Sequence, residues 1–253
     1  MVLPGIDSRF NDDYDAVVTP GCNWNPQFSD RYFSADNGLL ERQLVFVQAN
    51  RLTDRVVELA NSRPLIIGEL GFGSGLNLVA LALALRNIAL HKPPVIHWYS
   101  VDCQPLTTEH ISQLLSGFDD LADVLPTFLR GYEALGLPQI VADSVGHGRV
   151  TFGWVTLELH ILRGDVAGFP AVLPPMVDAW LLDGHDPAKN PAMWSESLFR
   201  QLRARSHDRT SLASWSAAGS VKRALRTAGF VVVRQPGFGQ KRHRIVGHCQ
   251  QLE

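Results

Sequence analysis

The first feature that bears on chemistry is an acid followed by three glycines at alternate positions, in LIIGELGFGSGLN. Glu69 ends an apolar run, and Gly71, Gly73 and Gly75 follow it. Glycine adopts backbone conformations closed to other residues and lets a ligand approach the main chain. A glycine turn between a buried strand and a helix is typical of a nucleotide site at the carboxyl end of a sheet.

The spacing of the glycines separates two nucleotide ligands. The dinucleotide fingerprint G-x-G-x-x-G requires a glycine where Leu76 stands. The pattern E-x-G-x-G-x-G resembles that of methyltransferases that use S-adenosylmethionine (SAM), so we predict SAM as the cofactor. A turn that serves only the packing of helix on sheet is the alternative.

Two further carboxylates end predicted strands. Asp102 closes WYSVD, and we predict that it accepts hydrogen bonds from the ribose hydroxyls, with a helix cap as the alternative. Asp165 in LRGDV is predicted to contact the adenine amino group, with an ordinary turn aspartate as the alternative.

The stretch VDAWLLDGHDPAKNPAMW places an acid at each end of one predicted strand. Asp183 ends the strand and is therefore expected at the ligand, whereas Asp178 is expected at the opposite rim. An amine must lose its proton before it can attack a methyl group. We predict that Asp183 orients such an amine and takes this proton. His185 is a second candidate base or a plain loop histidine.

Strands and helices alternate along the chain, which predicts a mostly parallel α/β sheet closed by an antiparallel C-terminal hairpin. We predict an N-terminal arm or lid at residues 1–50 and a single methyltransferase domain at residues 51–253. Strands are expected at residues 64–70, 95–102, 176–184, 210–216, 230–237 and 242–249, and residues 149–165 are expected to form two strands or one hairpin. Helices are expected at residues 44–60, 74–90, 105–118, 190–206 and 217–229.

Composition fits a folded protein: 253 residues, 45% of them hydrophobic and 19% charged. No apolar run is long enough to span a membrane, and the first residues lack the pattern of a secretory signal. Cys22, Cys103 and Cys249 are too far apart for a disulfide framework or a metal site. We therefore expect a cytoplasmic protein that holds no metal.

Positive charge gathers near the C-terminus. Between Arg200 and Arg244 the chain carries eleven Lys or Arg and one acid, Asp208, although its net charge is −2. Such a basic segment favours a polyanionic partner, and a solvated face lying on an acidic neighbour is the alternative.

Several motifs together resemble one family. DRYFSADNGLLERQLVF, ELGFGSGLN, LLDGHDPAKNPAMW, SAAGSVKRALRTAGF and PGFGQKRHRIVG are similar, in this order, to the methyltransferase domain of the bacterial bifunctional tRNA 5-methylaminomethyl-2-thiouridine biosynthesis proteins (MnmC). The resemblance runs from about Asp30 to Gly247. It implies the Rossmann-like, class I fold of SAM-dependent methyltransferases, with tRNA as the substrate and methylation of an aminomethyl group on its wobble uridine.

The resemblance also implies roles for particular residues. Asp183 corresponds to the proposed catalytic acid, and Asn77 joins the glycine turn as a cofactor-binding residue. Tyr32 and Phe33 are predicted to stack on the flipped base, or else to pack on the sheet edge. The other residues predicted to bind tRNA are Lys189, Phe238, Lys241, Arg242 and Arg244. A separate FAD-dependent oxidase is expected to supply the aminomethyl group.

The chain departs from the family pattern beside the predicted site. Leu40 stands where the family has an acid, DGHDPAKNP replaces DGFAPAKNP, and GFGQKRH replaces GFGRKRE. Three other functions therefore stay open: methylation of a small-molecule or protein amine, methylation of a nucleobase amine, for which DPAK and NPAM are imperfect motifs, and RNA binding without catalysis.

Overall fold

A single sheet organises the molecule in the computed structural model, which describes residues 23–25, 28–34 and 37–249. Its strand order is β5-β6-β4-β3-β7-β8-β10-β9, and β6, β4, β3, β7 and β8 run parallel. The strands are β3 (Leu65–Leu70), β4 (Val95–Asp102), β5 (Ser144–Phe152), β6 (Val155–Arg163), β7 (Val177–Leu182), β8 (Ser206–Ser214), β9 (Phe230–Pro236) and β10 (His243–Cys249).

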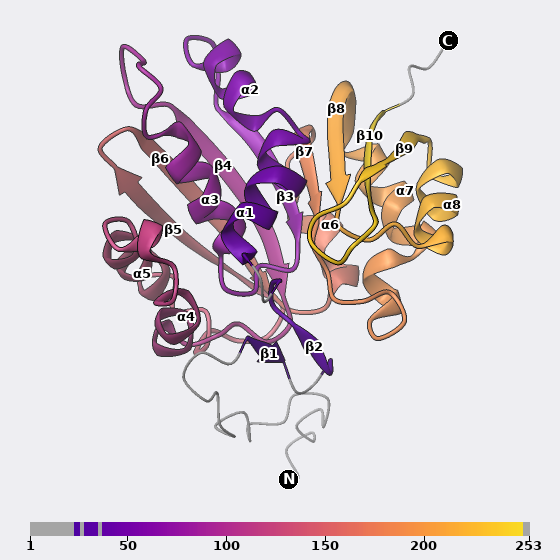
Figure 1. Cartoon of the computed structure of the whole chain (residues 1–253), viewed down its shortest axis with the longest axis horizontal. Helices are drawn as coiled ribbons and strands as arrows, with labels where there is room; N and C mark the ends of the chain where they lie inside the picture. The colour runs from indigo at the N-terminus through magenta and orange to yellow at the C-terminus, as the bar shows by residue number, and fades with distance from the viewer. Residues whose placement is uncertain (1–22, 26–27, 35–36, 250–253) are drawn as a thin grey trace, which may run out of the picture.

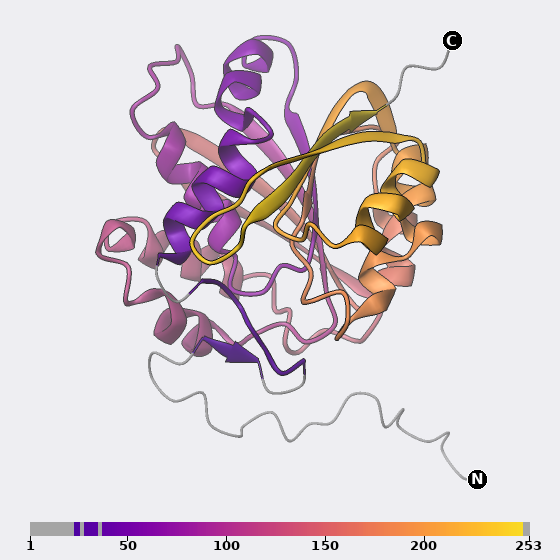
Figure 2. The ribbon, with the colours of Figure 1, turned by 45° about the vertical axis from the view of Figure 1, so that its right-hand side comes forward.

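Helices cover the sheet in two groups, one on each face (Figures 1 and 2). On one face lie α1 (Gly38–Arg42), the π-helix η1 (Gln43–Gln48), α2 (Leu52–Leu59), α3 (Leu76–Leu85), α4 (Thr108–Leu115) and α5 (Leu125–Glu133). On the other lie α6 (Phe169–Val172), α7 (Glu196–Ala204) and α8 (Gly219–Thr227). The short helices η2 (Asp119–Leu121), η3 (Val166–Gly168) and η4 (Pro191–Trp194) lie in connections.

The central strands are apolar because both of their faces are covered. Every residue of β7 is buried, and Trp98 of β4 and Trp180 of β7 are fully enclosed. The two faces of the sheet carry separate hydrophobic cores, one under α1 to α5 and one under α6 to α8. This packing fixes the tips of β3, β4, β6 and β7 beside one another.

An ion pair between the buried Asp178 and the partly exposed Arg63 fastens the starting end of β7. Asp178, 2% exposed, accepts hydrogen bonds from both terminal nitrogens of Arg63 at 2.7 Å, from the backbone of Ile66 and from His207. Burial would raise the pKa of Asp178, but these hydrogen bonds hold it below its ordinary value. The acid expected at the opposite rim therefore lies there, in a structural role.

The predicted sheet is confirmed: it is mostly parallel, and β10 pairs antiparallel with both β8 and β9. The residues from 149 to 165 divide into the end of β5 and all of β6, which form a second antiparallel hairpin at the other edge. The sequence left residues 119–150 unassigned. They hold η2, α5 and most of β5, and α5 contains Pro126 and Gly131, which are more typical of turns than of helices.

The predicted arm divides into three parts. Residues 1–22 lie outside the described residues. Strands β1 (Trp24–Asn25) and β2 (Asp30–Arg31) pair antiparallel below the sheet in Figure 1, and the described residues 23–25 and 28–34 are called the ribbon here. Leu39, Val45 and Phe46 of the following helical segment are buried in the main core, so this segment is built into the domain. The predicted boundary at residue 50 therefore lies directly after a helical segment that already packs in the main core.

Among the described residues, every helix is too short or too polar to cross a membrane.

Candidate active site

A cavity of about 520 Å³ opens at the carboxyl ends of the parallel strands. Its size suits a small organic ligand. The walls come from the turn after β3, the tips of β4 and β6, the loop after β7, the ribbon, and the loop between β9 and β10. Most of the residues predicted for cofactor and substrate therefore surround one space.

The glycine turn forms the floor between β3 and α3. Gly71, Gly73 and Gly75 all have positive φ angles, of 86°, 54° and 72°. A side chain on Gly71 would reach within 3.3 Å of the backbone oxygen of Asp183, so this glycine lets the β3 turn lie against the tip of β7. Gly71 and Gly73 line the cavity.

Gly75 does not line the cavity. A Cβ atom there would lie 2.4 Å from the ring of Phe128 and 3.0 Å from that of Phe72. The residue predicted to let a ligand approach instead lets two aromatic rings of the core approach the start of α3. Its role in this structure is packing.

The predicted ribose acid, Asp102, lies at the tip of β4 and binds the glycine turn. Its two carboxylate oxygens accept hydrogen bonds of 2.8 Å, one from the backbone of Gly73 and one from that of Gln104. Burial raises the pKa of Asp102, against these hydrogen bonds. A carboxylate has about four lone-pair positions, so it can still accept from a ligand. Asp165 lines the cavity as well and caps η3 through the backbone of Ala167.

Glu69 lies behind the cavity wall. It is fully buried on β3 and does not line the cavity. Its carboxylate accepts hydrogen bonds from Asn77, from the indole of Trp98 and from the hydroxyl of Ser100, each of 2.8 or 2.9 Å. Burial raises the pKa of Glu69 to about 8, since these neutral donors only partly offset desolvation. Its link to the cavity runs through Asn77.

Asn77 of α3 joins the two carboxyl groups. Its side-chain nitrogen donates to Glu69 Oε1 and to Asp183 Oδ2, both at 2.8 Å. Its side-chain oxygen is buried and has no hydrogen-bond partner among the described residues. Asn77 lines the cavity, so this oxygen is available to a ligand with N–H or O–H groups.

The predicted catalytic acid, Asp183, lies directly after β7 with its side chain 10% exposed. Arg42 of α1 contacts Asp183 Oδ1 at 2.6 Å, and Asn77 binds the other oxygen. Burial raises the pKa of Asp183 to about 6, while the charge of Arg42 acts in the opposite direction. Asp183 is therefore ionised at neutral pH and able to accept a proton.

The ribbon lies against the loop after β7. Asp30 accepts a hydrogen bond of 2.9 Å from the backbone of Asp186, and its carboxylate lies 3.5 Å from His185 and 3.8 Å from Lys189. His185 also stacks on Phe28 at 4.6 Å. Burial raises the pKa of Asp30, but the contacts with His185 and the backbone outweigh it and lower the pKa.

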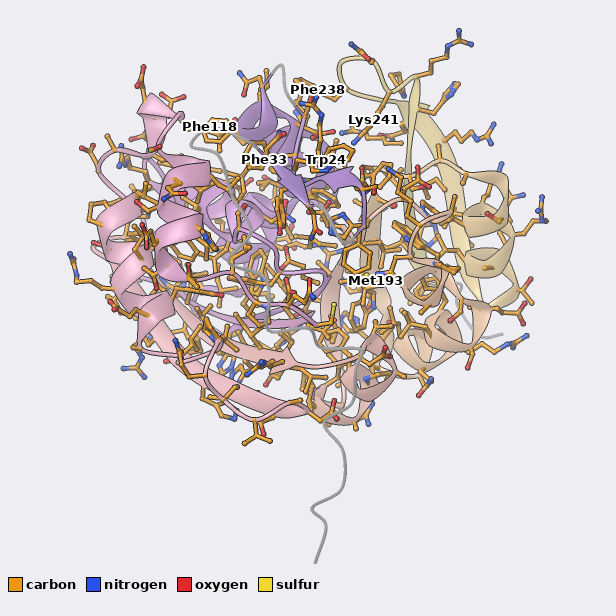
Figure 3. All side chains as sticks on the ribbon, turned by 90° about the horizontal axis from the view of Figure 1, so that it is seen from below. Trp24, Phe33, Phe118, Met193, Phe238 and Lys241 are labelled. Carbon is orange, nitrogen blue, oxygen red and sulfur yellow. The ribbon has the colours of Figure 1, made fainter. Side chains whose placement is uncertain are left out.

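Aromatic side chains and one ion pair line the outer part of the cavity. Tyr32, Phe33, Trp215 and Phe238 all belong to its wall. Lys241 lies 2.9 Å from the fully buried Glu41 and 4.2 Å from the ring centroid of Trp215. Figure 3, which views the molecule from the ribbon side, shows Phe33, Phe238 and Lys241 close together.

The structure separates the predicted tRNA-binding cations. Lys189 donates to the backbone oxygen of Ser29 and lies 5.8 Å from the ring of Trp24, so it fastens the ribbon. Arg244 donates to the backbone oxygen of Leu44 inside the molecule. These two are held by internal contacts that the charge pattern did not reveal. Arg242 is exposed and has no ion pair within the described part of the chain.

Sequence reasoning gave no role to Arg42, Gln104 or Trp215, which all line the cavity. Arg42 is 5% exposed, and the adjacent Glu41 is fully buried. For Arg42, the sequence signal was this pair of opposite charges inside the largely apolar helical stretch GLLERQLVF. Charged residues are rarely buried unless they are paired.

The residues present fit SAM. Besides Asn77 Oδ1, the cavity wall holds a second buried acceptor without a partner among the described residues, Gln104 Oε1. SAM carries an ammonium, an adenine amino group and two ribose hydroxyls, all hydrogen-bond donors. An unsatisfied buried acceptor costs free energy, and such donors would satisfy it.

The fold is the Rossmann-like fold of SAM-dependent methyltransferases, and the cavity residues fit this cofactor. Residues 132–250 match a family described as S-adenosyl-L-methionine-dependent methyltransferase. The chain is also homologous, over most of its length, to the methyltransferase part of the bifunctional tRNA 5-methylaminomethyl-2-thiouridine biosynthesis proteins MnmC. The cofactor predicted from the glycine turn is confirmed at the level of the family.

Two of these relatives show the extent of the match. The chain is 38% identical over 227 residues to MnmC of Ectopseudomonas mendocina, with 88% of this chain and 33% of that protein covered. It is 34% identical over 227 residues to MnmC of Caulobacter vibrioides, with 86% and 35% covered. The chain thus spans about a third of the length of these relatives.

One solved structure shares the fold. The crystal structure of MnmC2 from Aquifex aeolicus superposes with a TM-score of 0.60 at 21% sequence identity, covering 87% of this chain and 64% of that one. This likeness supports the fold alone.

Proposed function

We propose that this protein transfers a methyl group from SAM to the amine of an aminomethyl group on a tRNA wobble uridine, giving 5-methylaminomethyluridine or its 2-thio form. The observation that carries the proposal is the position of Asp183. Its carboxylate lies in the same cavity as the glycine turn, ionised and bound by Arg42 and Asn77. The named relatives act in tRNA 5-methylaminomethyl-2-thiouridine biosynthesis.

The cofactor would lie between the glycine turn and the tips of β4 and β6. Asp102 would accept from its ribose hydroxyls, Asp165 would lie near its adenine, and Asn77 Oδ1 would accept from its ammonium. When bound there, SAM supplies a methyl group on a positively charged sulfur.

Asp183 acts on the acceptor. A primary amine is protonated in neutral water and has no lone pair to attack with. Asp183 takes one proton from this ammonium onto a carboxylate oxygen and keeps the neutral amine hydrogen-bonded. Arg42 holds the carboxylate in place, and the ribbon limits the entry of water. Acid–base assistance of this kind contributes about 10²–10⁴-fold to a rate.

The outer wall suits a base removed from its stack. Aromatic faces are offered by Tyr32, Phe33, Phe238 and Trp215, and base stacking on such faces stabilises single-stranded nucleotides.

Cys103 and Cys249 are free thiols, which agrees with a protein that acts on tRNA in the cytoplasm. The aminomethyl group must come from another activity. We infer an FAD-dependent oxidase, on the same polypeptide or on a separate protein.

The direct test is incubation with labelled SAM and hypomodified tRNA, followed by identification of the labelled nucleoside. We expect 5-methylaminomethyluridine or its 2-thio form from tRNA that carries the aminomethyl group. The Asp183→Asn variant should bind SAM with nearly unchanged affinity and lose at least about 10²-fold in turnover. Label on a different nucleoside, or only on small molecules or protein, would replace the proposed substrate. Full turnover by Asp183→Asn would remove this carboxylate from the mechanism.

A further inference from the structure

The guanidinium of Arg42 connects the catalytic strand with the ribbon that covers the cavity. One terminal nitrogen contacts Asp183 Oδ1 at 2.6 Å, and the other donates to the backbone oxygen of Tyr32 at 2.5 Å. The group lies 5.5 Å from the ring of Phe46 and is 5% exposed. Both terminal nitrogens of the guanidinium are thus bound to groups in the wall of the active site.

The local backbone presents two charged residues side by side. Arg42 ends α1, and the π-helix η1 begins at the next residue. π-Helical turns are rare and occur frequently at functional sites. Glu41 and Arg42 both line the cavity although they are consecutive, and each is buried against an opposite charge, Lys241 and Asp183 respectively. Burial of two adjacent charges costs desolvation free energy, so the stability of the core does not explain this pair.

The contacts of Arg42 continue around the rim of the cavity and return to the loop that carries Asp183. Tyr32, whose backbone Arg42 binds, receives a hydrogen bond of 3.1 Å on its hydroxyl from Asn25. The same Asn25 nitrogen lies 3.4 Å from His185 Nε2. His185 follows Asp183 by two residues. The catalytic loop and the ribbon are therefore parts of one closed ring of contacts.

We propose that Arg42 is a positioning residue: it fixes the Asp183 carboxylate for proton transfer and makes the ribbon that carries Tyr32 part of the same rigid unit. Removal of the guanidinium would free one oxygen of Asp183 and release the backbone of Tyr32 together. The kinetic test of this role rests on the proposed function, whereas the structural test, by hydrogen exchange, does not.

Several charged and polar groups face Asp183. They are Arg42 and Glu41 of α1, Asn77 of α3, Glu69 of β3 and Lys241 of the loop between β9 and β10. Of these, Arg42 supplies the strongest favourable charge, which opposes the effect of burial on the pKa of Asp183. Loss of this charge raises the pKa, so the carboxylate is protonated, and inactive as a base, up to a higher pH.

The kinetic experiment compares Arg42→Gln and Arg42→Lys with the control Arg51→Gln, which removes an exposed arginine nearby. For Arg42→Gln we expect kcat to fall about 10²-fold, as misplacement of a reacting group can cause. The acidic limb of its kcat–pH profile should move up by about one pH unit. Arg42→Lys keeps the charge but not the two-pronged geometry, so its limb should stay near that of the wild type while kcat falls. Arg51→Gln should match the wild type.

Chemical rescue distinguishes an effect of losing the guanidinium group from an effect of destabilising the fold. Arg42→Gly leaves a space of the right shape, and added guanidinium ion at low millimolar concentration should restore part of kcat and move the acidic limb back. Sodium chloride at the same ionic strength should restore neither.

A measurement without substrate keeps this inference distinct from the proposed function. Hydrogen exchange at residues 28–34 should be faster in Arg42→Gln than in Arg51→Gln, at a temperature at which both variants are folded. This result would support the bridging role even if the wild type failed to methylate tRNA. Exchange equal to that of the control, with an acidic limb that does not move and no rescue by guanidinium, would overturn the inference.

Discussion

Asn77 and Asp183 are joined by a 2.8 Å hydrogen bond from the side-chain nitrogen of α3 to the carboxylate at the tip of β7. The same nitrogen also binds Glu69, so both of its hydrogens are used and its oxygen is left for a ligand. A single amide thus connects the place where the cofactor is expected with the acid expected to take the proton. Its loss should affect both binding and turnover.

The variant Asn77→Leu tests this connection. It keeps roughly the volume but removes the donors and the acceptor, so we expect SAM to bind about 10–100-fold more weakly, as loss of a hydrogen bond to a charged group predicts. Turnover at saturating SAM should fall as well. Calorimetry and steady-state kinetics measure the two effects. Asn50→Leu is the matched control, since Asn50 is also buried and hydrogen-bonded but lies outside the cavity wall. Equal weakening of SAM binding by both variants would contradict the role of Asn77.

Glu69 should make the stability of the protein fall as the pH rises. Its pKa is raised to about 8 when folded, against an ordinary value near 4.5, so the folded state keeps a proton that the unfolded state has released. This stabilisation is complete below about pH 4.5 and is lost progressively until the pH passes about 8. Between pH 6.5 and 8 the loss is roughly 1 kcal/mol per pH unit, or about 3 °C in Tm.

Thermal unfolding across that range checks the prediction. Glu69→Gln cannot titrate, so its Tm should change little between pH 6.5 and 8, whereas Glu133→Gln, at an exposed position of α5, should keep the wild-type slope. A slope that persists in Glu69→Gln would assign the effect to another group.

Gly73 and Gly75 should respond differently to alanine. Gly75→Ala combines a positive φ with a Cβ atom 2.4 Å from Phe128, so we expect a loss of about 2–4 kcal/mol in the free energy of unfolding. At Gly73 the nearest atom, in Tyr32, would be 3.4 Å away, and the position lines the cavity. Gly73→Ala should therefore weaken SAM binding more than it lowers stability. Denaturant unfolding and calorimetry on both variants decide, and a reversed order of effects would refute this division of roles.

Arg242 should contribute to tRNA affinity through charge alone. It is exposed and without an ion pair in the described residues, so Arg242→Ala should lower the slope of log Kd against log salt by about one. Lys189→Ala should change this slope less, because Lys189 is bound to the ribbon. Filter binding at several salt concentrations measures both. Identical slopes for the wild type and Arg242→Ala would place the tRNA elsewhere.

The sequence by itself determined the features that depend on neighbouring residues. A glycine turn after a buried strand is a local arrangement, so Gly71, Gly73 and the cofactor class could be predicted from one short stretch. Asp102 and Asp183 could be predicted for a related reason: the carboxyl ends of parallel strands meet at one edge of the sheet, wherever the strands lie in the order.

Only the tertiary structure decided which charged groups meet. Arg42 lies 141 positions from Asp183, and Lys241 lies 200 positions from Glu41. Nothing in the spacing of such residues records their partner, because ion pairs form wherever packing brings charges together. The same reason binds Lys189 and Arg244 to internal groups that their charge did not indicate, and places Glu69 and Gly75 behind the cavity wall.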